Sequence, residues 1–152
     1  MPEPLSIALG VLQVADTGVK LAKTLYGGAQ NIKNAKVELK RLADEVDSTS
    51  SILRNFGELL KEDDTARICR PALHTDALST LDRCNDAFNE LDAAVQSCCK
   101  PASSSSRSNP IPWKWPFNKN RTMLLQDRLK GLKSDLTLML SMLQYARMSS
   151  SK

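Results

Sequence analysis

Hydrophobic residues recur along most of this chain in alternating steps of three and four, a spacing that places them on one face of an α-helix. Each such seam predicts a long amphipathic helix, whose apolar face can be buried only against another helix or an equivalent surface. The seam positions are Ile32, Ala35, Leu39, Leu42, Val46, Thr49, Leu53, Phe56 and Leu60; then Ala77, Leu81, Cys84, Phe88, Leu91, Val95 and Cys98; then Leu125, Leu129, Leu132, Leu136, Met139, Leu143 and Ala146.

The N-terminal segment differs from these three, because two apolar stripes coexist on it and its first half is apolar on nearly every face. We expect such a helix to be surrounded by other helices or by lipid. Gly27 and Gly28 are predicted to end it by supplying left-handed backbone. Its uncharged run from Leu5 to Ala15 lacks the basic start of a signal peptide and is shorter than the roughly 20 apolar residues that span a bilayer, so we expect neither an export signal nor a transmembrane helix. The candidate residues for membrane contact or self-association are Leu5, Ile7, Leu9, Val11, Leu12 and Val14.

These patterns predict an all-α fold, an antiparallel four-helix bundle in one domain over residues 1–148. The helices are expected at about 4–26, 32–61, 71–99 and 119–147, with Pro71 in a first turn where proline is tolerated. A long loop rich in Ser and Pro, 100–118, precedes the last helix, and a flexible tail covers 149–152. A length of 152 residues, with 41% apolar and 25% charged residues, suits a soluble domain with a sizeable core.

Charge is distributed unevenly along the chain. Residues 1–100 carry 12 Lys/Arg against 15 Asp/Glu, a balance of −3, whereas residues 101–152 carry 9 against 2, a balance of +7. The basic surface candidates are Lys114, Lys119, Arg121 and Arg128. Such a segment can bind an anionic lipid or nucleic acid, or it can complement the acidic remainder of its own fold, and the sequence leaves both open.

Both tryptophans lie in the stretch WKWPF, directly after the Ser/Pro run. Three roles compete for it: a nucleic-acid patch, a membrane-interface anchor, and a loop anchor formed by Trp113, Trp115, Pro116 and Phe117 against the end of the bundle. Two tryptophans and one lysine are too few for a stacking surface, so nucleic acid is the least favoured partner. Local packing is preferred, and membrane contact is the second interpretation.

The sequence contains no constellation that predicts catalysis. His74 is the only histidine, and neither a phosphate-binding P-loop nor a nucleophile elbow occurs. The four cysteines form no C-x-x-C pair, so no zinc site is expected. Cys84 and Cys98 lie on an apolar seam, where cysteine acts as a small hydrophobe, whereas Cys69 and Cys99 fall near helix ends. We therefore predict no enzyme, no cofactor and no metal, in a reducing cytoplasmic setting.

Two stretches carry a resemblance to a known family. The opening PEPLSIALGVLQVADTGVKLAKTLYGG resembles the start of the fungal HeLo-like N-terminal domain of STAND (NLR-like) proteins. The later KWPFNKNRTMLLQDRLKGLKSDLTLML is similar to that family's Lys-Trp-Pro-Phe element and the Leu-rich helix after it. Glu3 stands where the family usually has Asp, and Glu is a weaker helix N-cap.

The resemblance implies a HeLo-like helical bundle that is the effector of a cell-death or heterokaryon-incompatibility system. Its members precede a nucleotide-binding module and ankyrin or other repeats, and are thought to oligomerise at the plasma membrane and permeabilise it. The same domain occurs on a protein encoded in fungal azaphilone pigment clusters. Since this chain ends at MSSSK, we expect either an excised domain or a stand-alone protein.

Two functions follow as hypotheses. The first is a non-enzymatic effector that self-associates and acts on an anionic membrane, moving from the cytoplasm to the plasma membrane. The second is a protein-interaction or regulatory scaffold without membrane activity, as an accessory to a pigment cluster or as a partner of a nucleotide-binding and ankyrin-repeat region, since heptad seams equally suit partner helices.

Overall fold

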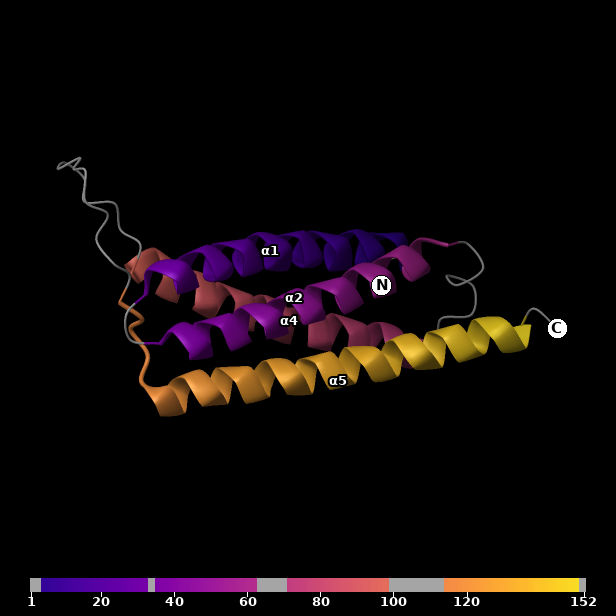
Figure 1. Cartoon of the computed structure of the whole chain (residues 1–152). Helices are drawn as coiled ribbons and strands as arrows, with labels where there is room; N and C mark the ends of the chain where they lie inside the picture. The colour runs from indigo at the N-terminus through magenta and orange to yellow at the C-terminus, as the bar shows by residue number, and fades with distance from the viewer. Residues whose placement is uncertain (1–3, 33–34, 63–70, 99–113, 151–152) are drawn as a thin grey trace.

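The computed structural model of the chain describes residues 4–32, 35–62, 71–98 and 114–150. These residues form four helices: α1 (Pro4–Asn31), α2 (Lys36–Lys61), α4 (Pro71–Cys98) and α5 (Lys119–Ser150). Consecutive helices run in opposite directions, and each packs against two others, α1 and α5 both contacting α2 and α4 (Figure 1). The prediction of an all-α antiparallel four-helix bundle is confirmed.

The heptad seams form the core of this bundle. Every position of the seam from Ile32 to Leu60 is buried, as are the seam positions of α5 from Leu125 to Leu143. On α4 the buried seam residues include Phe88 and Leu91, whereas Leu81 is half-buried. Because each helix contributes one continuous apolar stripe, the four stripes meet along the bundle axis and exclude water over its length.

The helix bounds differ from the predicted ones at three ends. Gly27 and Gly28 do not end α1, which continues to Asn31, so the predicted end at residue 26 was wrong. Gly28 and Ala29 are buried, and this packing stabilises a helix through residues that favour a turn locally. Likewise α5 includes Ser149 and Ser150, which were assigned to a tail, and α2 begins at Lys36 instead of 32. Of the predicted loop 100–118, residues 100–113 lie outside the described part.

Small residues recur at intervals of seven on both α1 and α2. On α1 these residues are Ala8, Ala15, Ala22 and Ala29, and on α2 they are Ala43, Ser50 and Gly57. All of them are buried, and the interface between α1 and α2 is the most extensive in the bundle. Since small side chains let two backbones approach closely, this pattern fixes α1 tightly against α2.

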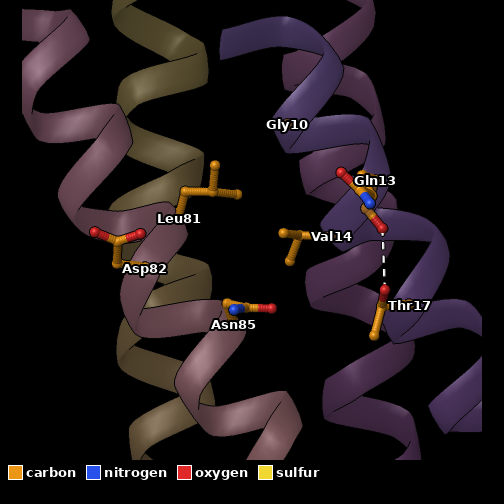
Figure 2. A pocket seen from close by; sticks show the side chains of 7 residues that line it. All are labelled: Gly10, Gln13, Val14, Thr17, Leu81, Asp82 and Asn85. Carbon is orange, nitrogen blue, oxygen red and sulfur yellow. Dashed lines mark hydrogen bonds between the residues drawn. The ribbon is translucent and has the colours of Figure 1, made fainter. Parts of the chain in front are cut away.

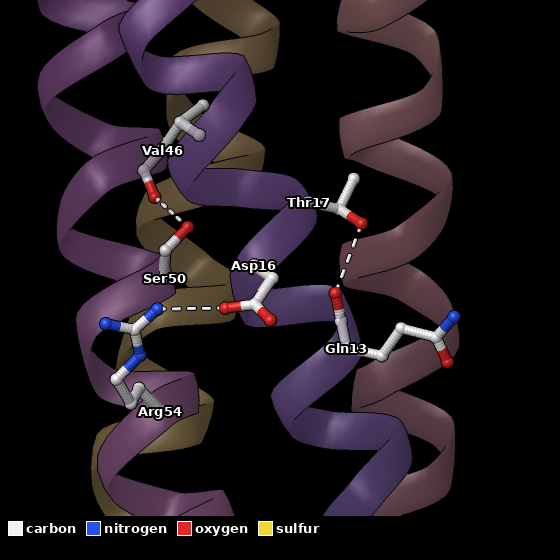
Figure 3. Close-up of polar contacts among 6 residues, drawn as sticks. All are labelled: Gln13, Asp16, Thr17, Val46, Ser50 and Arg54. Atoms are coloured by element: carbon white, nitrogen blue, oxygen red, sulfur yellow. Dashed lines mark hydrogen bonds and ion pairs between the residues drawn. The ribbon is translucent and has the colours of Figure 1, made fainter.

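Gly18 marks the closest approach on α1. A Cβ atom at Gly18 would lie 1.9 Å from Ser50 Oγ and 2.7 Å from Phe88 Cε2, so the position accepts no side chain without movement. Ser50 has little freedom to move, because it is buried and its hydroxyl donates to the Val46 carbonyl at 2.8 Å (Figure 3).

Polar contacts at the edge of the α1/α2 interface join the two helices. The Arg54 guanidinium lies 2.9 Å from Asp16 Oδ1, an exposed ion pair (Figure 3). Nearer the other end Tyr26 donates a hydrogen bond to Asp44, and this bond raises the pKa of Tyr26 to about 12. Exposed pairs of this kind contribute little to stability, so the packing of the small residues dominates the interface.

We expect Gly18→Ala to destabilise the fold and Gly27→Ala to stabilise it, although both replace a helical glycine by a better helix former. A Cβ at Gly27 meets nothing within 4 Å, so its substitution should raise the free energy of unfolding by about 0.4–1 kcal/mol. At Gly18 the overpacking should outweigh that gain by about 1–3 kcal/mol. Urea unfolding followed by far-UV circular dichroism measures both, and equal stabilities would contradict the close α1/α2 packing.

Candidate functional site

The WKWPF stretch docks onto the bundle through Trp115. This side chain is only 2% exposed, and its indole N–H donates to Thr122 Oγ1 at 2.9 Å. The Thr122 hydroxyl in turn donates to the Asn118 carbonyl at 3.0 Å. Phe117 packs edge-on against Trp115, with ring centroids 5.2 Å apart, and the Arg121 guanidinium lies 4.6 Å above the Phe117 ring. Trp115 is therefore sequestered from solvent and serves packing in this structure.

Other residues around this stretch have different positions. Pro116 and Lys114 are exposed, and Trp113 lies outside the described residues. Asn118 precedes α5, and its side-chain oxygen accepts a hydrogen bond from the Arg121 backbone N–H at 2.8 Å, which makes it the helix N-cap. Sequence analysis did not single out Asn118, although an Asn directly before a helical seam is an N-cap signal.

The cations of the basic C-terminal third largely face carboxylates of the acidic remainder. Arg121 and Arg128 both contact Glu90 on α4, at 3.1 and 3.5 Å. Lys133 lies 2.9 Å from Glu45 on α2, in the least exposed ion pair, and Arg147 pairs with Glu62. Within the described residues, Lys119 and Lys114 have no ion pair. Of the two interpretations of the charge asymmetry, the structure therefore favours complementation within the fold over a free anion-binding surface.

The candidate residues of α1 divide between inside and outside. Ile7 and Val11 are buried in the core, Leu12 and Val14 are half-buried, and Leu5 and Leu9 are 53% and 56% exposed. The described part of the chain does not enclose this helix on all sides, because Leu5 and Leu9 face outward one turn apart, so of the two expected surroundings the other helices cover only part of it. Its inward face is occupied by the core.

A second apolar stripe lies on the outer face of α5, where sequence analysis singled out no residue. Leu138, Met142 and Tyr145, hereafter the α5 ridge, are 62%, 54% and 73% exposed. Beside them a groove of about 430 Å³, the α4/α5 groove, opens between α5 and Ala72, Leu73 and Asp76 of α4. A signal was present in the sequence, since Leu138 and Tyr145 are seven residues apart and the stretch 136–146 contains no charged residue.

A further groove, of about 320 Å³, separates α1 from α4 (Figure 2). Gln13, Val14 and Thr17 line one side, and Leu81, Asp82 and Asn85 line the other. The Thr17 hydroxyl donates back to the Gln13 carbonyl of its own helix at 3.1 Å, so it is already satisfied. The groove contains a single ionisable group, Asp82, and it has no pair of groups that could act as acid and base.

Reactive chemistry is not assembled in the part of the chain that the structure describes. Burial raises the pKa of the Cys84 thiol to about 12, so this cysteine is protonated and inert as a nucleophile. No three His, Cys, Asp or Glu side chains among the described residues gather as metal ligands do. His74 is half-buried in the first turns of α4. Cys69, Cys99 and the side chain of Cys98 lie outside the described part of the chain.

The fold and these surfaces define a class of protein: an all-helical bundle domain that exposes apolar side chains on α1 and α5 in its described part. Within this class the chain belongs to the family described as pigment biosynthesis cluster protein PigL N-terminal, whose model matches residues 2–152. The resemblance to the HeLo-like N-terminal domain, which is named with that protein, is thereby confirmed. No curated protein and no solved structure matches the chain. The family description refers to the N-terminal part of a pigment-cluster protein and names no reaction.

We expect Thr122→Val to lower the free energy of unfolding by about 1–3 kcal/mol, because the buried Trp115 N–H then loses its acceptor. Thr137→Val is the matched control: Thr137 lies on the same helix and its hydroxyl also bonds the carbonyl four residues earlier, at 2.7 Å, but it is exposed. Urea unfolding monitored by tryptophan fluorescence compares the two. Equal effects would mean that Trp115 is not held by this hydrogen bond.

Proposed function

We propose that the chain is a non-catalytic interaction module of a pigment-cluster type of protein and that it acts by self-association through the α5 ridge. The observation that supports this function is the exposure of Leu138, Met142 and Tyr145 beside an apolar groove. Monomeric soluble proteins rarely expose contiguous apolar patches of this kind, and such patches mark interaction sites.

The composition of the ridge supports an interface with protein. Aromatic residues and Met are enriched at the centre of protein interfaces, whereas charged residues are depleted there. The outer face of α5 from 136 to 146 follows this pattern, since it exposes Met142 and Tyr145 and has no charge. α5 also has the weakest separation of apolar and polar faces among the four helices, as expected of a helix with one apolar face in the core and another outside.

The proposal includes a cytoplasmic location and further partners of the kind that the resemblance implies. A nucleotide-binding and ankyrin-repeat region, in the same chain or in another, is the partner class proposed beyond a second copy. Nucleic acid is not proposed as a partner, because Glu90 engages both Arg121 and Arg128, two of the four residues of the predicted basic surface.

A second candidate function, membrane targeting or permeabilisation in a cell-death system, is favoured by α1. This helix is long and apolar enough to cross a bilayer over Leu5–Gln30, although core helices of soluble proteins pass the same test. Inserting it would require removing Ile7, Val11, Leu21 and Leu25 from the core. Among the large apolar side chains of the described part of α1, Leu5 and Leu9 are the exposed ones, so insertion of this helix would follow a rearrangement.

We expect the purified chain to show a mass that rises with concentration, and the double substitution Leu138→Gln with Tyr145→Gln to keep it monomeric. The polar side chains remove apolar area that association would bury. Sedimentation velocity measures the mass, and circular dichroism verifies that the helices are retained. Val37→Gln is the control, since Val37 is 56% exposed on α2 and lies off the ridge. A wild-type chain that stays monomeric, or association indifferent to the double substitution, would refute self-association through the ridge.

The folded chain should release no dye from neutral or anionic liposomes, because the apolar face of α1 is occupied by the core. Leu9→Lys gives a clean comparison, since Leu9 is exposed and its substitution should leave the bundle intact. Dye release by the wild-type chain that disappears in Leu9→Lys would favour the membrane function over the interaction module.

A further inference from the structure

Charged side chains line the contact between α4 and α5 at intervals of seven residues. On α4 these positions are Glu90, Arg83 and Asp76. The matching positions on α5 are Arg128, Asp135 and Met142, and Met142 is the one that carries no charge. Arg128 lies 3.5 Å from Glu90, and Arg83 lies 3.2 Å from Asp135. At the third step Asp76 and Met142 line the α4/α5 groove together. The Asp76 carboxylate therefore has a thioether where the register would place a cation.

This face is consequently unbalanced in charge at its two ends. At one end Glu90 contacts both Arg121 and Arg128, which leaves one cation in excess. The pair of Arg83 with Asp135 in the middle is balanced. At the other end Asp76 has no ion pair with any described residue, which leaves one anion in excess beside an apolar groove. Counted over these six charged residues, the face runs from positive through neutral to negative.

The outer stripe of α5 carries apolar side chains at both ends of this face and a glycine between them. Leu124, 68% exposed, lies near the positive end, and the α5 ridge lies at the negative end. Gly131 lies midway, seven residues from Leu124 and from Leu138, and a Cβ there would meet nothing within 4 Å. Nothing inside the fold requires this glycine, which weakens the helix but allows another backbone to approach closely.

We propose that two copies of the chain pair through this face, with their α5 helices antiparallel and crossing near Gly131. The inference rests on the proposed self-association and defines its surface and orientation. In this arrangement Leu124 of one copy lies opposite Leu138, at the groove of the other. Arg121 of one copy, the second cation against Glu90, lies at the level of Met142 of the other copy and approaches Asp76 there. The two-fold axis repeats each contact, as in an isologous interface.

The occupant of the groove is a second copy because the face is complementary to itself. The excess cation and the excess anion lie at opposite ends of one surface, so antiparallel pairing brings unlike charges together twice. Parallel pairing would bring like charges together at both ends, which opposes association and fixes the orientation.

Sedimentation equilibrium of the full chain tests the pairing by a charge exchange. Asp76→Arg alone and Arg121→Glu alone each bring like charges together at both contacts, and each should weaken dimerisation at least about tenfold. An equimolar mixture of the two variants should dimerise again, because the charges are then opposite at both contacts. Circular dichroism verifies that each variant is folded.

Gly131 supplies an independent arm of the same experiment. Gly131→Gln should raise the stability of the fold, since glutamine is the better helix former and the site is open, and yet weaken dimerisation by separating the two helices. Gly27→Gln on α1, also open, should leave dimerisation unchanged.

The outcomes separate this inference from the function on which it rests. Folded variants that do not recover a dimer on mixing, or a wild-type dimer insensitive to Asp76→Arg and Gly131→Gln, would overturn the antiparallel pairing. If that dimer still depended on Leu138 and Tyr145, self-association through the ridge would stand without this geometry. A wild-type chain that stays monomeric at all concentrations would overturn both.

Discussion

The close approach of α1 to α2 is the constraint on which the rest of the bundle depends. Gly18 on α1 admits no added carbon beside Ser50 of α2, and Gly57 of α2 lies against Val11 and Leu12 of α1. The contacts of α4 with α1 and with α5 are less extensive, and grooves lie along both of them. The surfaces with functional potential therefore lie beside α4.

The same constraint bears on any membrane action of α1. Separating α1 from α2 exposes several large aliphatic side chains, and each is stabilised in the core by about 1.5–3 kcal/mol when fully buried. It also opens the most extensive interface in the molecule. A rearrangement that leaves α1 and α2 together and moves α4 disrupts smaller contacts. Any conformational change of this domain is therefore easier to place at α4 than at its first helix.

The sequence predicted the fold well because buried residues in a helical bundle follow one regular spacing of three and four. All nine positions of the seam from Ile32 to Leu60 are buried. It failed at Gly27 and Gly28, where tertiary packing overrides the local preference of glycine. Less of the candidate site could be predicted from the sequence. Periodicity does not tell which helices are neighbours, so the ion pairs of Glu90 and the outward turn of Leu5 could not be derived. The α5 ridge was not predicted, because α5 carries both a buried seam and a second apolar stripe, and the spacing alone does not tell which of the two faces solvent.

Two features of α5 are unfavourable within the isolated fold. Gly131 weakens the helix without relieving any close contact, and Leu138, Met142 and Tyr145 expose apolar surface to water without contributing fully to the core. Both occur on one face, and on that face the ion pairs with α4 leave opposite charges in excess at the two ends. The weakened helix at Gly131 and the exposed apolar side chains destabilise the isolated fold without a compensating contact inside it. We therefore expect the compensating contact to come from a surface that covers the ridge. Among possible partners, a second copy of α4 and α5 is the one whose charges and apolar residues are already specified by the chain itself.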